Sequence, residues 1–222
     1  MEAALATIAG EPIDTTCAGR TDRGVHAVEQ VVHFDTQAER PDTAWVRGVN
    51  SGLPPQVAIL WARRVDAKFH ARYSATSRAY RYRLLNRPVR AALAAAHAGW
   101  FPLPLDLERM REAAALLVGQ HDFSAFRSAE CQATTPVRTL HSFDIEKQGD
   151  ELAFKITANA FLHHMVRNLV GSLVYVGNGK HPPRWVRDVL ESKDRGRAAP
   201  TFAPEGLYLE KVVYDASWGL PQ

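Results

Sequence analysis

The segment Ala18–Ala27 reads AGRTDRGVHA and places one acidic residue, Asp22, between two arginines and two glycines. Glycine adopts positive φ angles without strain and lets the backbone approach a ligand closely. The flanking Arg20 and Arg23 favour the ionised form of Asp22. An ionised carboxylate suits a nucleophile or a base acting beside an anionic substrate. Taken alone, the segment is better explained as a surface loop that forms an ordinary salt bridge.

Short regular elements are expected on both sides of this loop. The pattern predicts a helix over Glu2–Ile8 and another from Asp42 to Gly48. The segments expected to be extended are Ile13–Ala18, Glu29–Asp35, Gln56–Val65 and Ser77–Leu85. In the last of these the period is two, so Tyr80 shares a face with Tyr82 and Leu84, whereas Arg81 and Arg83 lie on the other face.

Positive charge is concentrated in the first half of the chain. Nine basic residues and one acidic residue lie between Arg63 and Arg90, whereas residues 106–222 carry 14 basic and 15 acidic side chains. Aromatic side chains alternate with the arginines, a composition suited to phosphates and stacked bases. Arg72 and Arg78 are the candidates for RNA contacts. The alternative is a solvated strand face with extended arginine side chains.

A segment rich in alanine and proline, 86–104, separates this basic half from the balanced half. We therefore expect two lobes, residues 1–104 and 105–222, each mixing helices with strands. The second lobe is expected to contain a helix from Asp106 to Val118, a hairpin of Leu140–Lys147 with Glu151–Thr157, a helix over Phe161–Val176, a helix that begins at Pro182–Pro183 and runs through Glu191, and a strand over Gly206–Tyr214.

Composition excludes several classes of protein. The chain has 222 residues, 46% of them hydrophobic, with a net charge of +3, so it is expected to fold rather than to be disordered. Its longest apolar run contains Arg167 and is too short to span a membrane. The N-terminus does not resemble a secretory signal, and two cysteines distant in sequence favour a reducing compartment. A cytoplasmic protein with no membrane partner is expected.

Common enzymatic motifs are absent from the sequence. There is no G-x-S-x-G motif, and Gly177–Lys180 lacks the first glycine of a phosphate-binding loop. The nine histidines show no metal-binding spacing. His163 and His164 would lie about 100° apart on a helix, so we expect them not to face one ion together. No metal and no cofactor is expected.

Four blocks of the sequence resemble the TruA-type tRNA pseudouridine synthases. The first is Gly19–Ala27, the second combines Phe69–Ala75 with Arg78–Tyr82, the third is Asn159–Asn168, and the fourth is Glu205–Leu209. The blocks occur in the family's order and cover nearly the whole chain. The resemblance implies the pseudouridine synthase fold, a mixed α/β fold in which two ferredoxin-like lobes merge their sheets around a cleft.

The resemblance also implies roles for individual residues. Asp22 matches the essential aspartate, Arg167 the arginine that pairs with it, and Arg20 an arginine associated with extruding the nucleotide. Tyr80 matches the tyrosine that stacks on the target uracil, and Leu207 lies in the apolar block that closes the base pocket. The implied activity is isomerisation of uridine to pseudouridine at positions 38, 39 and/or 40 of the tRNA anticodon stem-loop, by a homodimer without metal or cofactor.

The chain departs from the family pattern at two places. Arg23 stands where many relatives have alanine, which adds positive charge beside Asp22. The family also begins with a strand and a Tyr-Asp-Gly…Gly-Trp-Gln block, whereas this chain opens inside the helix that follows it. This beginning is expected to reflect either a misplaced start or fragment boundary, or a shortened relative. The alternative function is therefore a catalytically inactive RNA-binding module.

Overall fold

The computed structural model describes residues 1–221, and the chain forms two compact units. The first unit contains Met1–Arg20, Gln30–Ala75 and Val213–Gln222, and the second contains Thr21–Glu29 and Thr76–Val212. Both units are therefore discontinuous in sequence. The two lobes expected from the sequence, residues 1–104 and 105–222, have different boundaries from these two units. That division stays a prediction.

The second unit is built on a seven-stranded mixed sheet. Its main strand order is β2-β9-β4-β8-β7-β6, and β5 pairs in parallel with β4. The strands are β2 (His26–Ala27), β4 (Ala75–Asn86), β5 (Gly99–Phe101), β6 (Gly119–Asp122), β7 (Val137–Gln148), β8 (Glu151–Ala158) and β9 (Leu207–Tyr214). The pairs β4·β8, β7·β8 and β6·β7 are antiparallel, whereas β2 and β9 are parallel. The mixed α/β architecture expected for the fold is confirmed.

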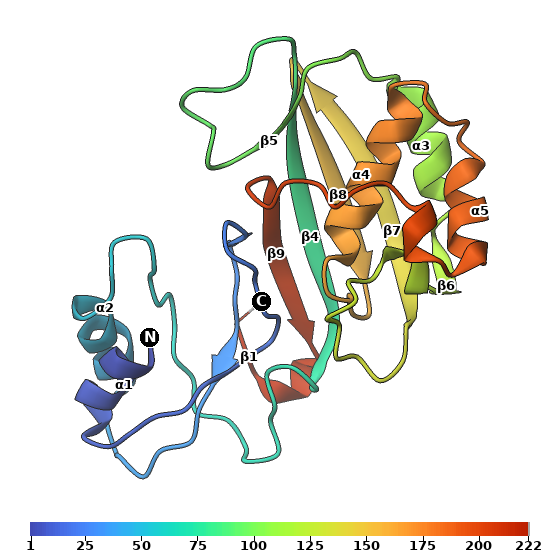
Figure 1. The fold of residues 1–222 in the computed structure, drawn as a ribbon. Helices are drawn as coiled ribbons and strands as arrows, with labels where there is room; N and C mark the ends of the chain where they lie inside the picture. Colours follow the sequence, from blue (N-terminus) through green and yellow to red (C-terminus); the bar gives the residue numbers. More distant parts are fainter. Residues whose placement is uncertain (222) are drawn as a thin grey trace. The chain divides into compact units, whose positions relative to one another are not determined.

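Three helices pack beside this sheet: α3 (Leu107–Ala115), α4 (Met165–Gly177) and α5 (Trp185–Ser192) (Figure 1). Asp106 caps α3 by accepting a hydrogen bond from the Arg109 backbone N–H, as its position before an apolar stripe predicts. Helix α4 is the most deeply buried of the three and carries leucine and valine into the core. Its apolar residues share one core with the alternating apolar residues of β8, namely Leu152, Phe154 and Ile156.

The first unit has little regular structure. It contains α1 (Glu2–Ala9), the short antiparallel pair β1 (Thr16–Cys17) and β3 (Val32–His33), and a π-helical turn, Ala44–Gly48, that continues into α2 (Val49–Ser51). Ala4, Leu5, Ala9, Ile13 and Val49 form its small core. Gly48 lies close to α1, where an added Cβ would come within 2.7 Å of the terminal Cδ1 of Ile8.

Some predicted elements are shorter in the structure, and one is not formed. Glu29–Asp35 was expected to be one strand, yet only Val32 and His33 are in strand conformation. Gln56–Val65 forms no strand, although its composition is extended and apolar. The helix expected from Phe161 begins at Met165, which changes the position of two histidines in the site. No helix of the described residues is long and apolar enough to cross a membrane.

Candidate active site

The loop that carries Asp22 is fixed by a tight turn. The Val25 backbone N–H donates to the Asp22 carbonyl oxygen at 3.0 Å. Gly24 has φ +85°, as the third position of a type II turn requires. A Cβ on Gly24 would also lie 3.1 Å from Pro204 Cγ, so both the conformation and the space favour glycine. The turn places Asp22 just before β2, at one end of the sheet.

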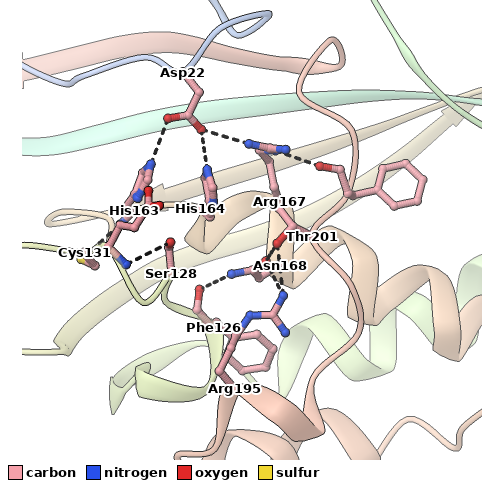
Figure 2. A network of polar contacts seen from close by, with 12 residues as sticks. Asp22, Phe126, Ser128, Cys131, His163, His164, Arg167, Asn168, Arg195 and Thr201 are labelled. Carbon is pink, nitrogen blue, oxygen red and sulfur yellow. Dashed lines mark hydrogen bonds and ion pairs between the residues drawn. The ribbon is translucent and has the colours of Figure 1, made fainter.

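Arg167, in the first turn of α4, pairs with this carboxylate (Figure 2). Its Nη1 donates to Asp22 Oδ2 at 3.0 Å, and its Nε donates to the Phe202 carbonyl oxygen at 2.8 Å. The Arg167 side chain is 13% exposed and that of Asp22 28% exposed. Because the guanidinium is held at two points, its direction toward Asp22 is defined by the 199–206 segment as well as by α4.

A buried hydrogen-bond network is centred on Asn168, the residue that follows Arg167. Asn168 is fully buried, and its Nδ2 donates to the Phe126 carbonyl oxygen at 2.8 Å. Asn168 Oδ1 accepts from Arg195 Nη2 at 3.0 Å and from Thr201 Oγ1 at 2.7 Å. The network joins the start of α4 to the segment that contains Phe202, the second partner of Arg167. A fully satisfied network of this kind rigidifies the elements it connects.

Two adjacent histidines contact the same carboxylate, contrary to the sequence prediction. His163 Nε2 lies 3.1 Å from Asp22 Oδ1, within a hydrogen bond, and His164 Nε2 lies 3.1 Å from Oδ2. The prediction that they could not face one point assumed a helix, but His164 is the N-cap of α4 with left-handed angles, φ 63° and ψ 2°. A non-glycine residue in such a conformation costs on the order of 1–3 kcal/mol, which the surrounding structure must offset.

The electrostatic state of His164 follows from its surroundings. Burial lowers the pKa of His164 below its ordinary value, and the neighbouring His163 lowers it further. The Asp22 carboxylate acts in the opposite direction, while Arg167 adds to the decrease. The neutral imidazole of His164 is thus favoured, and the Arg167 guanidinium supplies a positive charge beside Asp22.

The ligating atoms of Asp22, His163 and His164 lie within 4.8 Å of one another, close enough for three ligands of a metal ion. Each ring nitrogen, however, is already at hydrogen-bond distance from a carboxylate oxygen. Arg167 contacts the same carboxylate, so a bound cation would face a guanidinium a few ångströms away. The donor set alone therefore fits hydrogen bonding better than metal binding. That catalysis needs no metal stays a prediction.

Tyr80 and Leu207 belong to the same unit as Asp22. Tyr80 is half-buried on β4, and its ring contacts Phe161 edge to face with centroids 4.9 Å apart. Leu207 is buried at the start of β9 and packs in the main core. The preceding Gly206 leaves room for the strand, because a Cβ there would clash with the Arg83 carbonyl oxygen and the Tyr82 ring.

The remaining predicted arginines differ in exposure. Arg23 is exposed in the Asp22 turn. Arg78 is buried, 7% exposed, and its Nη1 donates to the Asn159 carbonyl oxygen at 3.1 Å. Arg20 and Arg72 are exposed and belong to the first unit. Of the predicted site residues, the structure brings Asp22 and Arg167 into direct contact.

Three residues of this group were not predicted from the sequence: His163, His164 and Asn168. Asn168 carries a readable signal, because a polar side chain within the apolar run 165–176 must find buried partners. The histidines give no such signal, because their convergence depends on where the helix begins.

Together, the mixed sheet and the carboxylate–guanidinium pair agree with the class of pseudouridine synthases. The sequence matches the family described as tRNA pseudouridine synthase over residues 1–74 and 113–215. The chain therefore belongs to the tRNA pseudouridine synthases, which are isomerases.

Individual relatives are similar over the whole chain. A tRNA pseudouridine synthase A from Methylobacillus flagellatus is 56% identical over 221 residues, which are 100% of this chain and 85% of the relative. The protein of the same name from Herminiimonas arsenicoxydans is 57% identical, covering 100% of this chain and 82% of the relative. The one from Thiobacillus denitrificans is 58% identical, with 100% and 85% covered.

Proposed function

We propose that this chain isomerises uridine to pseudouridine at positions 38, 39 and/or 40 in the anticodon stem-loop of tRNA. The observation that carries the proposal is the contact between Asp22 and Arg167, which joins the first and third family blocks at 3.0 Å. It supplies a carboxylate with a fixed counter-charge in a partly exposed position. Such a group can act directly on a nucleoside.

The chemistry requires one bond exchange within the nucleotide. The bond between N1 of uracil and C1′ of ribose breaks, a bond between C5 and C1′ forms, the C5 proton leaves and N1 gains a proton. Atoms and electrons balance without an oxidant, a reductant or a cofactor. Asp22 either attacks the nucleoside or abstracts a proton while the glycosidic bond breaks. Arg167 holds the carboxylate and offsets its charge.

The target base must leave its stack before this chemistry can occur, at a cost of a few kcal/mol. We assign Tyr80 to stacking on the uracil, which returns on the order of 1–3 kcal/mol per base. Leu207 closes the apolar side of the pocket, and Arg20 assists extrusion. Arg23, Arg72 and Arg78 are assigned to the RNA backbone. Because Arg78 is buried, its side chain can contact only a phosphate that comes close to the protein surface there.

The proposal includes a homodimer and a cytoplasmic location, both implied by the family resemblance. The alternative is an RNA-binding module without activity. It predicts tRNA binding without isomerisation, so one set of assays separates the two functions.

The test uses the full chain and tRNA transcripts with uridine at position 38, 39 or 40, one position at a time. Pseudouridine is mapped by carbodiimide modification and primer extension, and the protein's mass in solution is measured by light scattering. We expect modification at one or more of these positions and none in transcripts with cytidine there. Binding without any modification would favour the inactive module, and modification confined to another arm of tRNA would overturn the assigned positions.

A further inference from the structure

His163 and His164 contact opposite oxygens of the carboxylate that carries the proposed chemistry (Figure 2). His163 reaches Oδ1, and His164 reaches Oδ2, each at 3.1 Å. The two rings lie side by side with centroids 4.0 Å apart and an interplanar angle of 33°. Both imidazole rings therefore contact the same carboxylate group.

The backbone around these rings is built to hold them there. The Ser128 N–H donates to the His163 carbonyl oxygen at 3.0 Å, and the His163 N–H points to Cys131 Sγ at 3.5 Å. His164 adopts the left-handed conformation that turns its ring toward the same carboxylate before α4 begins. The position of both rings is therefore set by tertiary contacts and not by helix periodicity.

Hydrogen bonds to both oxygens of the Asp22 carboxylate fix its orientation. Arg167 donates one hydrogen bond to Asp22, from Nη1 to Oδ2, and the carboxylate could still rotate about that single contact. The His163 hydrogen bond holds the other oxygen, Oδ1, and two contacts on different oxygens define the plane of the group. An ionised carboxylate only accepts hydrogen bonds. Nε2 of His163 must therefore carry a hydrogen and act as the donor.

We propose that His163 and His164 are positioning residues that fix the plane of the Asp22 carboxylate for its reaction with the nucleoside. This inference rests on the proposed function. A group held within a fraction of an ångström of its reactive position gains much of its rate from orientation, and a misplacement of about 1 Å can cost roughly 10²-fold. The histidines themselves neither attack nor transfer the C5 proton in this scheme.

The test compares substitutions that keep or remove the Nε2 donor. At His163, Gln places an amide N–H near the position of Nε2, whereas Ala removes the donor. At His164, Gly keeps the left-handed backbone and removes the ring, so any loss reports on the imidazole rather than on strain. His141, an exposed histidine on β7, supplies the control His141→Ala. Each variant is measured by single-turnover rate at saturating enzyme, tRNA Kd and thermal melting.

We expect His163→Ala and His164→Gly to lower the single-turnover rate by roughly 10- to 100-fold, with tRNA Kd changed less than about threefold. His163→Gln should recover a large part of the loss, and His141→Ala should match the unmodified chain. Unchanged rates in both ring-removing variants would overturn the inference. So would a loss confined to tRNA Kd, or a rate that only follows the melting temperature and is not rescued by Gln. If the unmodified chain modifies no tRNA, the proposed function fails instead.

Discussion

Arg167 and Asp22 are 145 positions apart in sequence, yet Nη1 of the arginine donates to Oδ2 of the aspartate at 3.0 Å. The contact joins a glycine-containing turn to the first turn of a buried helix. Each partner is held independently: Asp22 by the Val25 hydrogen bond across its turn, and Arg167 by the Phe202 carbonyl oxygen. The pair thus depends on the tertiary structure of the second unit.

Replacing Asp22 by Asn should remove the reacting group and keep the size of the side chain. We expect turnover to fall by at least about 10⁴-fold, as when a nucleophile or base is deleted from other enzymes. Binding of tRNA should stay within a few-fold, because phosphate contacts supply most of the affinity. Tritium release from C5-labelled uridine in tRNA measures the turnover. Near-normal release by this variant would remove Asp22 from the chemistry.

Arg167→Lys tests whether charge alone is sufficient at this position. Lysine keeps the charge but presents a single ammonium, which cannot copy the two directed contacts to Asp22 and to Phe202. We expect turnover to fall roughly 10- to 10²-fold and the melting temperature to decrease. A matched control is Arg187→Lys on α5, a partly exposed arginine paired with Glu191. Full activity of Arg167→Lys would show that the directed geometry is dispensable.

The sequence predicted the elements that carry strong local signals. The hairpin of β7 and β8 is marked by alternating apolar residues on both sides of Gly149, and α3 by Asp106 at its N-cap. Asp22 and Arg167 were identified because family blocks contain them. The position of His164 was not predictable in the same way, because it has left-handed angles and the neighbouring His163 is held by Ser128 and Cys131, which are distant in sequence. Likewise, the apolar composition of 56–65 is typical of a strand, but no partner strand pairs with it in the described part of the chain.

Tyr80 allows stacking to be separated from proton transfer. Tyr80→Phe keeps the ring and removes only the hydroxyl, whereas Tyr80→Leu removes both. We expect Phe to lose roughly 10²–10⁴-fold in turnover while still binding RNA, because the reattached uracil must lose its C5 proton. Leu should also weaken base binding by about 1–3 kcal/mol.

The neighbouring Tyr82 supplies the control for Tyr80. It is fully buried on the same strand, and its hydroxyl donates to the Ala203 carbonyl oxygen at 2.8 Å. Tyr82→Phe should lower the melting temperature without changing single-turnover rates of the folded protein. If Tyr80→Phe is fully active, the hydroxyl has no chemical role, and an equally active and stable Tyr80→Leu would exclude the residue from the site.

Salt dependence tests the assignment of the basic stretch to RNA. Each phosphate that a side chain neutralises steepens the plot of log K against log salt by roughly 0.7–0.9. Arg72 is exposed, so Arg72→Ala should flatten the slope by about that amount while the melting temperature stays constant. Arg78 is buried with a hydrogen bond to Asn159, so Arg78→Ala should lower the melting temperature in addition to flattening the slope. A slope near zero for the unmodified chain would favour a solvated strand face.

The pKa of His164 makes the stability of the second unit depend on pH. Burial and the adjacent His163 lower this pKa, with Arg167 acting in the same direction and Asp22 and Glu130 opposing. Because the pKa in the folded chain lies below the unfolded value of about 6.5, the unfolded chain binds more protons between the two values. The stability contributed by neutral His164 is therefore complete above about pH 6.5 and is lost as the pH falls through the folded pKa.

His164→Gln has no such group, so on going from about pH 7.5 to about pH 5.5 the unmodified chain should lose more free energy of unfolding than the variant. Urea unfolding of both proteins at these two pH values measures the difference. An equal loss in the two proteins would show that His164 does not titrate differently in the folded and unfolded chains.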